Sequence, residues 1–188
     1  KQMKRYMSFL IAFVLCSAVL PAGASQRLTW RDCISPQQLI GAGNYHTVAV
    51  RADGTVAAVG KNDTQWYNPA QCDVGGWTDV IAVSAGYNKT MALRRDGTVL
   101  YAGIRDYGQG DVEGWTDIVA VSAGSNHCVG LRRDGTVLAC GMNSGGQTNV
   151  AEWTDIVAVS AGNGYTLGLR ADGTVAATGY DDNGRMDV

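Results

Sequence analysis

The chain has 188 residues, of which 46% are hydrophobic and 17% charged, with 25 glycines and only 3 prolines. This composition suits a packed domain and excludes collagen-like, coiled-coil and wholly disordered chains. Segment 1–24 holds 3 of the 15 basic residues and no acidic residue, so without it the net charge falls from -2 to -5. A chain this acidic is a poor nucleic-acid binder, and we expect no nucleic-acid partner.

Residues 1–24 have the features of a secretory signal peptide. Lys4 and Arg5 precede an apolar run of 14 residues, Met7–Leu20, and small residues follow it up to Ala24. A membrane span needs about 20 apolar residues, so this run is too short to be a stable anchor. We therefore predict cleavage after Ala24, secretion from a bacterial cell, and no stable membrane insertion.

After a lead-in at 25–36 that matches nothing else, the chain repeats itself. Trp-Thr-Asp begins at positions 77, 115 and 153, and Asp-Gly-Thr-Val begins at 53, 96, 134 and 172. The spacing is 38 residues, except for a first interval of 43 that contains an insertion around 65–71. A fixed period of this length indicates an array of small supersecondary units. The predicted units are 37–76, 77–114, 115–152 and 153–188.

The third unit shows the pattern predicted for all four. Its apolar run 118–123 is typical of a strand covered on both faces. Segments 127–132 and 136–141 flank an Asp-Gly turn, which predicts a hairpin. The segment 146–150 is predicted as a short fourth strand, as is 109–112 in the unit before it. The fold class is therefore all-β, with three or four strands in each unit.

Units of about 40 residues with so few strands are typical of a β-propeller, in which each small sheet is buried between its neighbours. Both phenylalanines, Phe9 and Phe13, lie in segment 1–24. The sheets must therefore pack through smaller residues such as Val, Ala and Gly. The recurring tryptophans Trp77, Trp115 and Trp153 are expected to fill equivalent gaps between blades, while a stacking ladder for sugars is the alternative.

Two stretches point to a family. Gly-x-x-His-Thr-Val-Ala-Val-Arg-x-Asp-Gly-Thr-Val at 43–56 and Ser-Ala-Gly-Ser-Asn-His-Cys-Val-Gly-Leu-Arg-Arg-Asp-Gly-Thr-Val at 122–137 resemble the regulator of chromosome condensation repeat. The short units are similar to the secreted bacterial form of this family, which includes a β-lactamase inhibitory protein. The resemblance implies a seven-bladed propeller that binds proteins.

Only four units are present, so the resemblance leaves three architectures open. The chain could be a fragment of a longer propeller, an open arc that forms a homo-oligomer, or a smaller ring. The family's chromatin regulator promotes nucleotide exchange on a nuclear GTPase, which an exported acidic protein would not meet. That activity is not expected here.

Strand alternation separates two faces of the predicted propeller. The Asp-Gly turns open on one face and have nearly the same sequence in every unit, which suits a turn that satisfies its own hydrogen bonds. The loops after the first and third strands open on the other face and differ in every unit. Aromatic and charged residues on rigidly held loops are typical of protein-binding sites. The predicted partner-binding residues are Tyr45, Asp63, Trp66, Tyr67, Tyr87, Arg105, Asp106, Tyr107, Asn143, Tyr180, Asp181 and Asp182.

The leading prediction is thus a secreted, non-enzymatic module that binds a protein through these loops. The alternative is a carbohydrate-binding module in which the loop Trp and Tyr side chains stack on sugar rings. His46 and His127 occupy one repeat position, which favours structural hydrogen bonds over catalysis. The sequence contains no Gly-x-Ser-x-Gly motif and no cluster with metal-ligand spacing, so we predict no enzyme activity, no metal and no cofactor.

Four cysteines follow segment 1–24, and export would place them in an oxidising compartment. If the Asp-Gly turn of the third unit carries a glycine bulge, Leu131 lies opposite Val137 and Cys128 opposite Cys140. Paired strand residues of this kind lie about 5.5 Å apart, which a disulfide tolerates. We predict a Cys128–Cys140 bond as one of two open outcomes, free thiols being the other. Cys33 and Cys72 are candidates for a second bond.

Overall fold

The computed structural model describes residues 36–62, 70–182 and 184–188. A short 3-10 helix, η2 (Pro36–Leu39), precedes twelve strands that form four three-stranded antiparallel sheets. The strands are β1 (Ile40–Ala42), β2 (His46–Val50) and β3 (Val56–Gly60) in the first sheet; β4 (Val80–Ala85), β5 (Lys89–Arg94) and β6 (Val99–Gly103) in the second; β7 (Ile118–Ala123), β8 (His127–Arg132) and β9 (Val137–Gly141) in the third; and β10 (Ile156–Ala161), β11 (Tyr165–Arg170) and β12 (Val175–Gly179) in the fourth.

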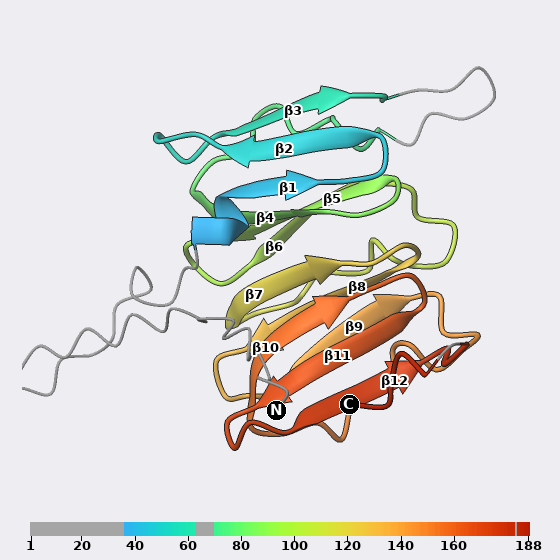
Figure 1. Cartoon of the computed structure of the whole chain (residues 1–188). Helices are drawn as coiled ribbons and strands as arrows, with labels where there is room; N and C mark the ends of the chain where they lie inside the picture. The colour runs from blue at the N-terminus through green and yellow to red at the C-terminus, as the bar shows by residue number, and fades with distance from the viewer. Residues whose placement is uncertain (1–35, 63–69, 183) are drawn as a thin grey trace, which may run out of the picture.

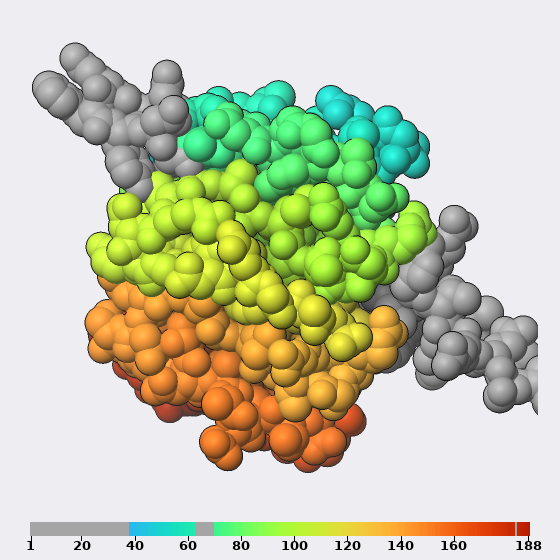
Figure 2. Space-filling view, turned by 180° about the vertical axis from the view of Figure 1, so that it is seen from behind, coloured from blue at the N-terminus to red at the C-terminus, as the bar shows by residue number. Residues whose placement is uncertain are grey.

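The four sheets are stacked in chain order, with β1 to β3 at one end and β10 to β12 at the other (Figure 1). Seen from behind, the successive units form bands across the molecule (Figure 2). The first and last sheets do not meet, so the described residues form four blades of an open β-propeller. This confirms the predicted fold class. Within the described ranges, no helix has both the length and the apolarity to cross a membrane.

The core consists of three apolar layers, one between each pair of adjacent sheets. The middle strands β5 and β8 of the two inner sheets are buried over five consecutive residues. Continuous burial thus falls on the middle strands, whereas the run 118–123, expected to be covered on both faces, has three residues that are partly exposed. Both results follow from blades that cover each other face to face.

The three tryptophans pack in these layers, as predicted. Trp115 and Trp153 are each 8% exposed, and Trp77 packs against the layer between the first two sheets. Glycine makes room for the rings in the third and fourth sheets: a Cβ atom on Gly130 or Gly168 would lie 2.7 Å from a ring carbon of the nearby tryptophan. A surface ladder for sugars is therefore not formed by these residues.

The hairpins have the predicted register. Leu131 lies opposite Val137 and Cys128 opposite Cys140. Gly135 has a φ of 84°, the left-handed conformation that the turn requires. The fourth strand, however, was predicted wrongly: residues 109–112 and 146–150 form turns and irregular backbone in the structure.

Backbone hydrogen bonds tie each blade to the next at the Asp-Gly turns. The aspartates of the Trp-Thr-Asp motifs, Asp79, Asp117 and Asp155, have φ values of 57 to 59°. This conformation places the next residue so that its amide donates to a glycine carbonyl in the preceding blade, as in Ile118 N to Gly97 O at 3.1 Å. The repeated motif is therefore a blade connector.

Candidate functional site

The loops after the first and third strands form one face of the stack, which we call the loop face. It comprises the residues that directly follow these strands, 43–45, 61–62, 70–73, 86–88, 104–111, 124–126, 142–149, 162–164, 180–182 and 184–187. The opposite face carries the four Asp-Gly turns, and we call it the turn face. In each turn the aspartate Oδ1 accepts from the amide and the hydroxyl of the threonine two residues on, as Asp134 does from Thr136 at 2.9 and 2.6 Å. The turns satisfy their own hydrogen bonds, as predicted.

The loop face brings together two predicted residues from different blades. The hydroxyl groups of Tyr45 and Tyr87 lie 3.1 Å apart, and their rings meet edge to face with centroids 5.3 Å apart. Lys61 Nζ lies 5.5 Å from the centre of the Tyr45 ring. The hydrogen bond with Tyr45 raises the pKa of the Tyr87 hydroxyl, which therefore stays protonated. Tyr45 and Tyr87 are 44% and 38% exposed, so they present a preformed aromatic surface.

The loop after β6 carries three further predicted residues, Arg105, Asp106 and Tyr107, and all three are exposed. Arg105 donates to Gly110 O at 3.1 Å, and its guanidinium lies 5.2 Å from the centre of the Tyr101 ring. These contacts tie Arg105 to its own loop and to β6, while Tyr107 is 52% exposed.

A recurring buried glutamine supports these loops. Gln71, Gln109 and Gln147 are at most 1% exposed. Gln109 Oε1 accepts from the Tyr107 amide at 2.8 Å, and Gln147 Oε1 accepts from the Gly145 amide at 2.9 Å. The sequence analysis missed this role, although Gln-x-(Asp/Asn)-Val recurs at the end of three units.

In the fourth unit Arg185 stands in the glutamine's place, and a small polar pocket opens beside it. The pocket encloses about 230 Å³ between the loops of the third and fourth blades. Arg185 lies over the Tyr165 ring at 5.4 Å and pairs with Asp182 at 3.9 Å. The other lining residues are Asn126, Met142, Gln147, Asn163, Gly164 and Tyr180. Arg185 was missed because the departure from glutamine is visible only once that repeat position is recognised.

Three predicted residues of the last two blades make side-chain hydrogen bonds, two within their own loops and one to the preceding blade. Asn143 bonds Asn149 and the Thr148 amide, both at 2.9 Å, and Asp181 accepts from the Met186 amide at 3.1 Å. Tyr180 donates to Ser144 Oγ at 2.9 Å and is 41% exposed. Asn143 and Asp181 therefore shape their loops, whereas Tyr180 presents a ring. Asp63, Trp66 and Tyr67 lie outside the described residues.

The buried basic residues join blades, in agreement with the structural interpretation of the histidines. His46 Nε2 lies 2.9 Å from Thr90 Oγ1, and His127 Nε2 lies 2.9 Å from Thr166 Oγ1. Burial, together with the charge of Lys89, lowers the pKa of His127 to about 4, so this ring is neutral near pH 7. In the part of the chain that the structure describes, no group of three His, Cys, Asp or Glu side chains could hold a metal ion.

The structure has the described cysteines as free thiols. Cys128 and Cys140 lie opposite each other as predicted, and a bond between them stays a prediction. Cys72 is also a free thiol, partly exposed, and Cys33 lies outside the described residues.

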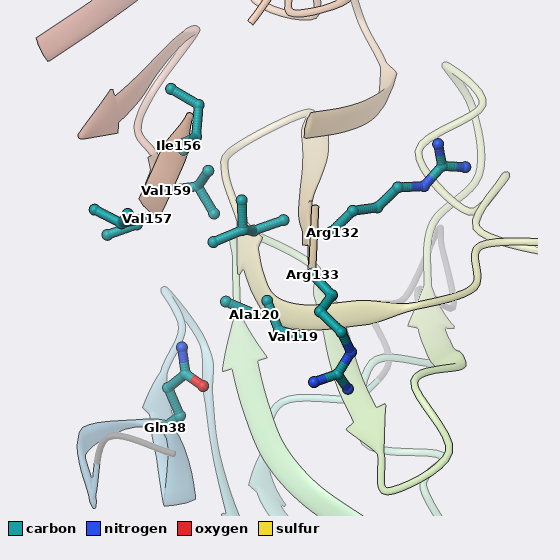
Figure 3. Close-up of a pocket in the computed structure, with 10 residues that line it drawn as sticks. Gln38, Val119, Ala120, Arg132, Arg133, Ile156, Val157 and Val159 are labelled. Atoms are coloured by element: carbon teal, nitrogen blue, oxygen red, sulfur yellow. The ribbon is translucent and has the colours of Figure 1, made fainter. Parts of the chain in front are cut away.

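A second cavity, of about 460 Å³, lies between β7 and β10, away from the loop face. In Figure 3 Val119 and Ala120 line it beside Val157 and Val159, and Gln38 of η2 lies across from them. Its lining combines aliphatic side chains of β7 and β10 with Leu131, Arg132 and Arg133.

Comparisons with known proteins agree with this architecture. The model of the regulator of chromosome condensation (RCC1) repeat matches residues 38–64, 118–147 and 156–185. A search of curated protein sequences found no match to the chain.

Solved structures share the fold at low sequence identity. Yeast RCC1 (Prp20), solved bound to Kap60, superposes with a TM-score of 0.63 at 18% identity over 76% of this chain and 43% of its own. Human WBSCR16 superposes with a TM-score of 0.60 at 19% identity, over 76% of this chain and 48% of its own. The CRINKLY ectodomain of the Arabidopsis thaliana receptor kinase ACR4 superposes with a TM-score of 0.59 at 20% identity, over 74% of this chain and 49% of its own. The chain spans less than half the length of each. The matched repeats and the blade architecture together identify the chain as a repeat protein of the regulator of chromosome condensation type.

Proposed function

We propose that the protein is a secreted, non-enzymatic interaction module whose loop face binds a protein partner. The observation that carries the proposal is the set of exposed tyrosines on the loop face, each tied to the scaffold by a side-chain or backbone bond. Tyr45, Tyr87, Tyr107 and Tyr180 are 38 to 52% exposed. Tyr45 and Tyr87 contact each other across two blades, Tyr180 donates to Ser144 of the preceding blade, and the Tyr107 amide donates to buried Gln109. Rigid aromatic side chains lose little entropy on binding and are enriched at binding hot spots.

Charge and relatives support a protein as the partner. The acidic balance after segment 1–24 disfavours nucleic acid. The structure of yeast Prp20 was reported with its binding to Gsp1p and histones, so an RCC1-type scaffold carries protein contacts there. For this chain we expect a different partner, met outside the cell.

The binding proposal is tested by measuring affinity for a partner captured from culture medium or cell-surface extract. We expect the Tyr45→Ala/Tyr87→Ala variant and the Tyr107→Ala variant to bind at least about tenfold more weakly, because loss of a hot-spot side chain costs about 2 kcal/mol or more. The matched turn-face variants Thr116→Ala and Arg133→Ala should bind as the parent does. Equal affinity of all variants would overturn the proposal, as would binding of the parent to a glycan array that the tyrosine variants lose.

Secretion has its own test. Expression of the full chain in a bacterial host should yield exported protein whose N-terminus is Ser25. Exported protein with an intact leader, or protein retained entirely in the cytoplasm, would contradict this part of the proposal.

A further inference from the structure

The third blade carries a pair of thiols where the other blades carry none. Cys128 of β8 lies opposite Cys140 of β9. The equivalent pairs are Thr47 with Val59, Thr90 with Ala102, and Thr166 with Thr178. Residues opposite each other on antiparallel strands have Cα atoms about 4.5 to 5.5 Å apart, within the span that a disulfide bridges. The backbone therefore already holds the two cysteines at bonding range.

A buried cation faces this pair from the second blade. Lys89 is fully buried, and its Nζ donates to Gly124 O at 2.9 Å and to Ser125 O. Carbonyl oxygens satisfy the ammonium hydrogens but supply no negative charge. Burial lowers the pKa of the Lys89 ammonium, and Cys128 and Cys140 oppose this shift when they are ionised.

Two departures from the repeat, Lys89 and Cys128, meet at the interface between the second and third blades. His46 and His127 occupy the position of Lys89, and each bonds a threonine of the next blade. In the blade that follows Lys89, Cys128 replaces that threonine. A buried positive charge is costly without an anion, and a cysteine thiolate is an anion that this site can form.

The environment distinguishes the two sulfurs. Cys128 is fully buried, and burial raises the pKa of its thiol well above its ordinary value. A hydrogen bond from Cys128 lowers the pKa of Cys140, which is partly exposed and also contacts Gln109 O at 3.5 Å. Cys140 is therefore the accessible nucleophile, and Cys128 is the thiol placed to react second.

We propose that Cys128, Cys140 and Lys89 form a redox-active dithiol site that is oxidised by low-molecular-weight disulfides. The Cys140 thiolate attacks one sulfur of the small disulfide, whose S–S bond breaks to release one small thiolate, and a mixed disulfide forms. Cys128 loses its proton and attacks the Cys140 sulfur, which expels the second small thiolate. The dithiol loses two electrons and two protons, and the small disulfide is reduced to two thiols.

The first test follows the thiols by mass spectrometry. The full chain is reduced, freed of reductant, incubated with excess oxidised glutathione, alkylated and cleaved with trypsin. Cleavage after Arg132 and Arg133 places Cys128 and Cys140 on different peptides, so the proposed bond yields a linked pair. We expect that pair and no glutathione on either cysteine. Unmodified thiols, or a mixed disulfide that persists on Cys140, would overturn the proposal.

The second test measures how Lys89 acts on Cys140. At pH 7 we expect Lys89→Met to slow alkylation of Cys140 by less than about tenfold, because the lysine charge lowers the pKa of this thiol less than the hydrogen bond from Cys128 does. The rate at Cys72 serves as the internal control and should not change. Lys89→His restores the residue of the first and third blades and should also slow the alkylation of Cys140. This second variant guards against a folding defect in Lys89→Met.

The third variant isolates the resolving thiol. Cys128→Thr, which restores the residue found in the other three blades, should leave Cys140 as a stable mixed disulfide with glutathione. An unchanged Cys140 rate in both lysine variants would overturn the role of Lys89, and disulfide formation by Cys140 with another cysteine in the Cys128→Thr variant would overturn the role of Cys128. None of these readouts depends on a partner of the loop face.

Discussion

A single repeat position shows how individual residues adapt this scaffold. It holds His46, Lys89, His127 and Tyr165 in the four blades. The two histidines bond a threonine in the next blade, and the lysine bonds carbonyl oxygens there. Tyr165 of the last blade instead stacks with Arg185 at the loop face. One buried position therefore serves blade adhesion, the dithiol site and the polar pocket.

The burial of His127 makes stability depend on pH. The unfolded histidine protonates near its ordinary pKa of 6.5, whereas burial and the charge of Lys89 keep the folded ring neutral down to about 4. The unfolded state therefore binds the proton first. The stabilisation is complete above pH 6.5 and is lost as the pH falls toward 4, by on the order of 3 kcal/mol.

Urea denaturation between pH 7 and pH 4.5 measures this effect. The free energy of unfolding should depend less steeply on pH in the His127→Gln variant than in the parent. Burial also lowers the pKa of His46, but this residue contributes equally in both proteins. Identical slopes for parent and variant would contradict the assignment.

Gly130 is expected to be intolerant of a side chain. An alanine Cβ would lie 2.7 Å from Trp115 Cζ3, so the ring must move within a packed layer. We expect Gly130→Ala to lower the free energy of unfolding by about 1 to 3 kcal/mol. Gly75→Ala, where no atom lies within 4 Å, should stay within about 0.5 kcal/mol of the parent. Denaturant titration followed by tryptophan fluorescence compares the two.

At the scale of elements, hairpins were predictable and the segments between blades were not. The Asp-Gly turn and the match of apolar residues across it fix the register of β8 and β9. In segments 109–112 and 146–150, which were predicted as strands, a buried glutamine accepts from the backbone of its own loop. That side-chain bond closes a local turn instead of a fourth pairing.

Blade adhesion relies on buried threonines that bridge neighbouring elements. Thr166 is fully buried, lies 2.9 Å from His127 Nε2 and donates to Gln147 O at 2.7 Å. We expect Thr166→Val to cost about 1 to 3 kcal/mol of the free energy of unfolding, because both partners lose a buried bond. Thr47→Val, at the equivalent but exposed position of the first blade, should be nearly neutral. Equal thermal unfolding shifts for both variants would refute this account.

For the whole molecule, the sequence predicts which loops share a face but not which side chains touch. Alternation of strands places Tyr45 and Tyr87 on one side, and their 3.1 Å contact depends on the spacing between blades. The polar pocket around Arg185 likewise needs two adjacent blades in position. The face could therefore be predicted from the sequence, whereas its aromatic pair and pocket required the stacked structure.

The central claim is that the loop face, and not the turn face, contacts a protein partner. Site-specific incorporation of a photo-crosslinking phenylalanine analogue at Tyr107 and, in a separate protein, at Arg133 tests it directly. Irradiation with the captured partner should give a covalent adduct from position 107 and none from position 133. An adduct from position 133 alone would contradict the account.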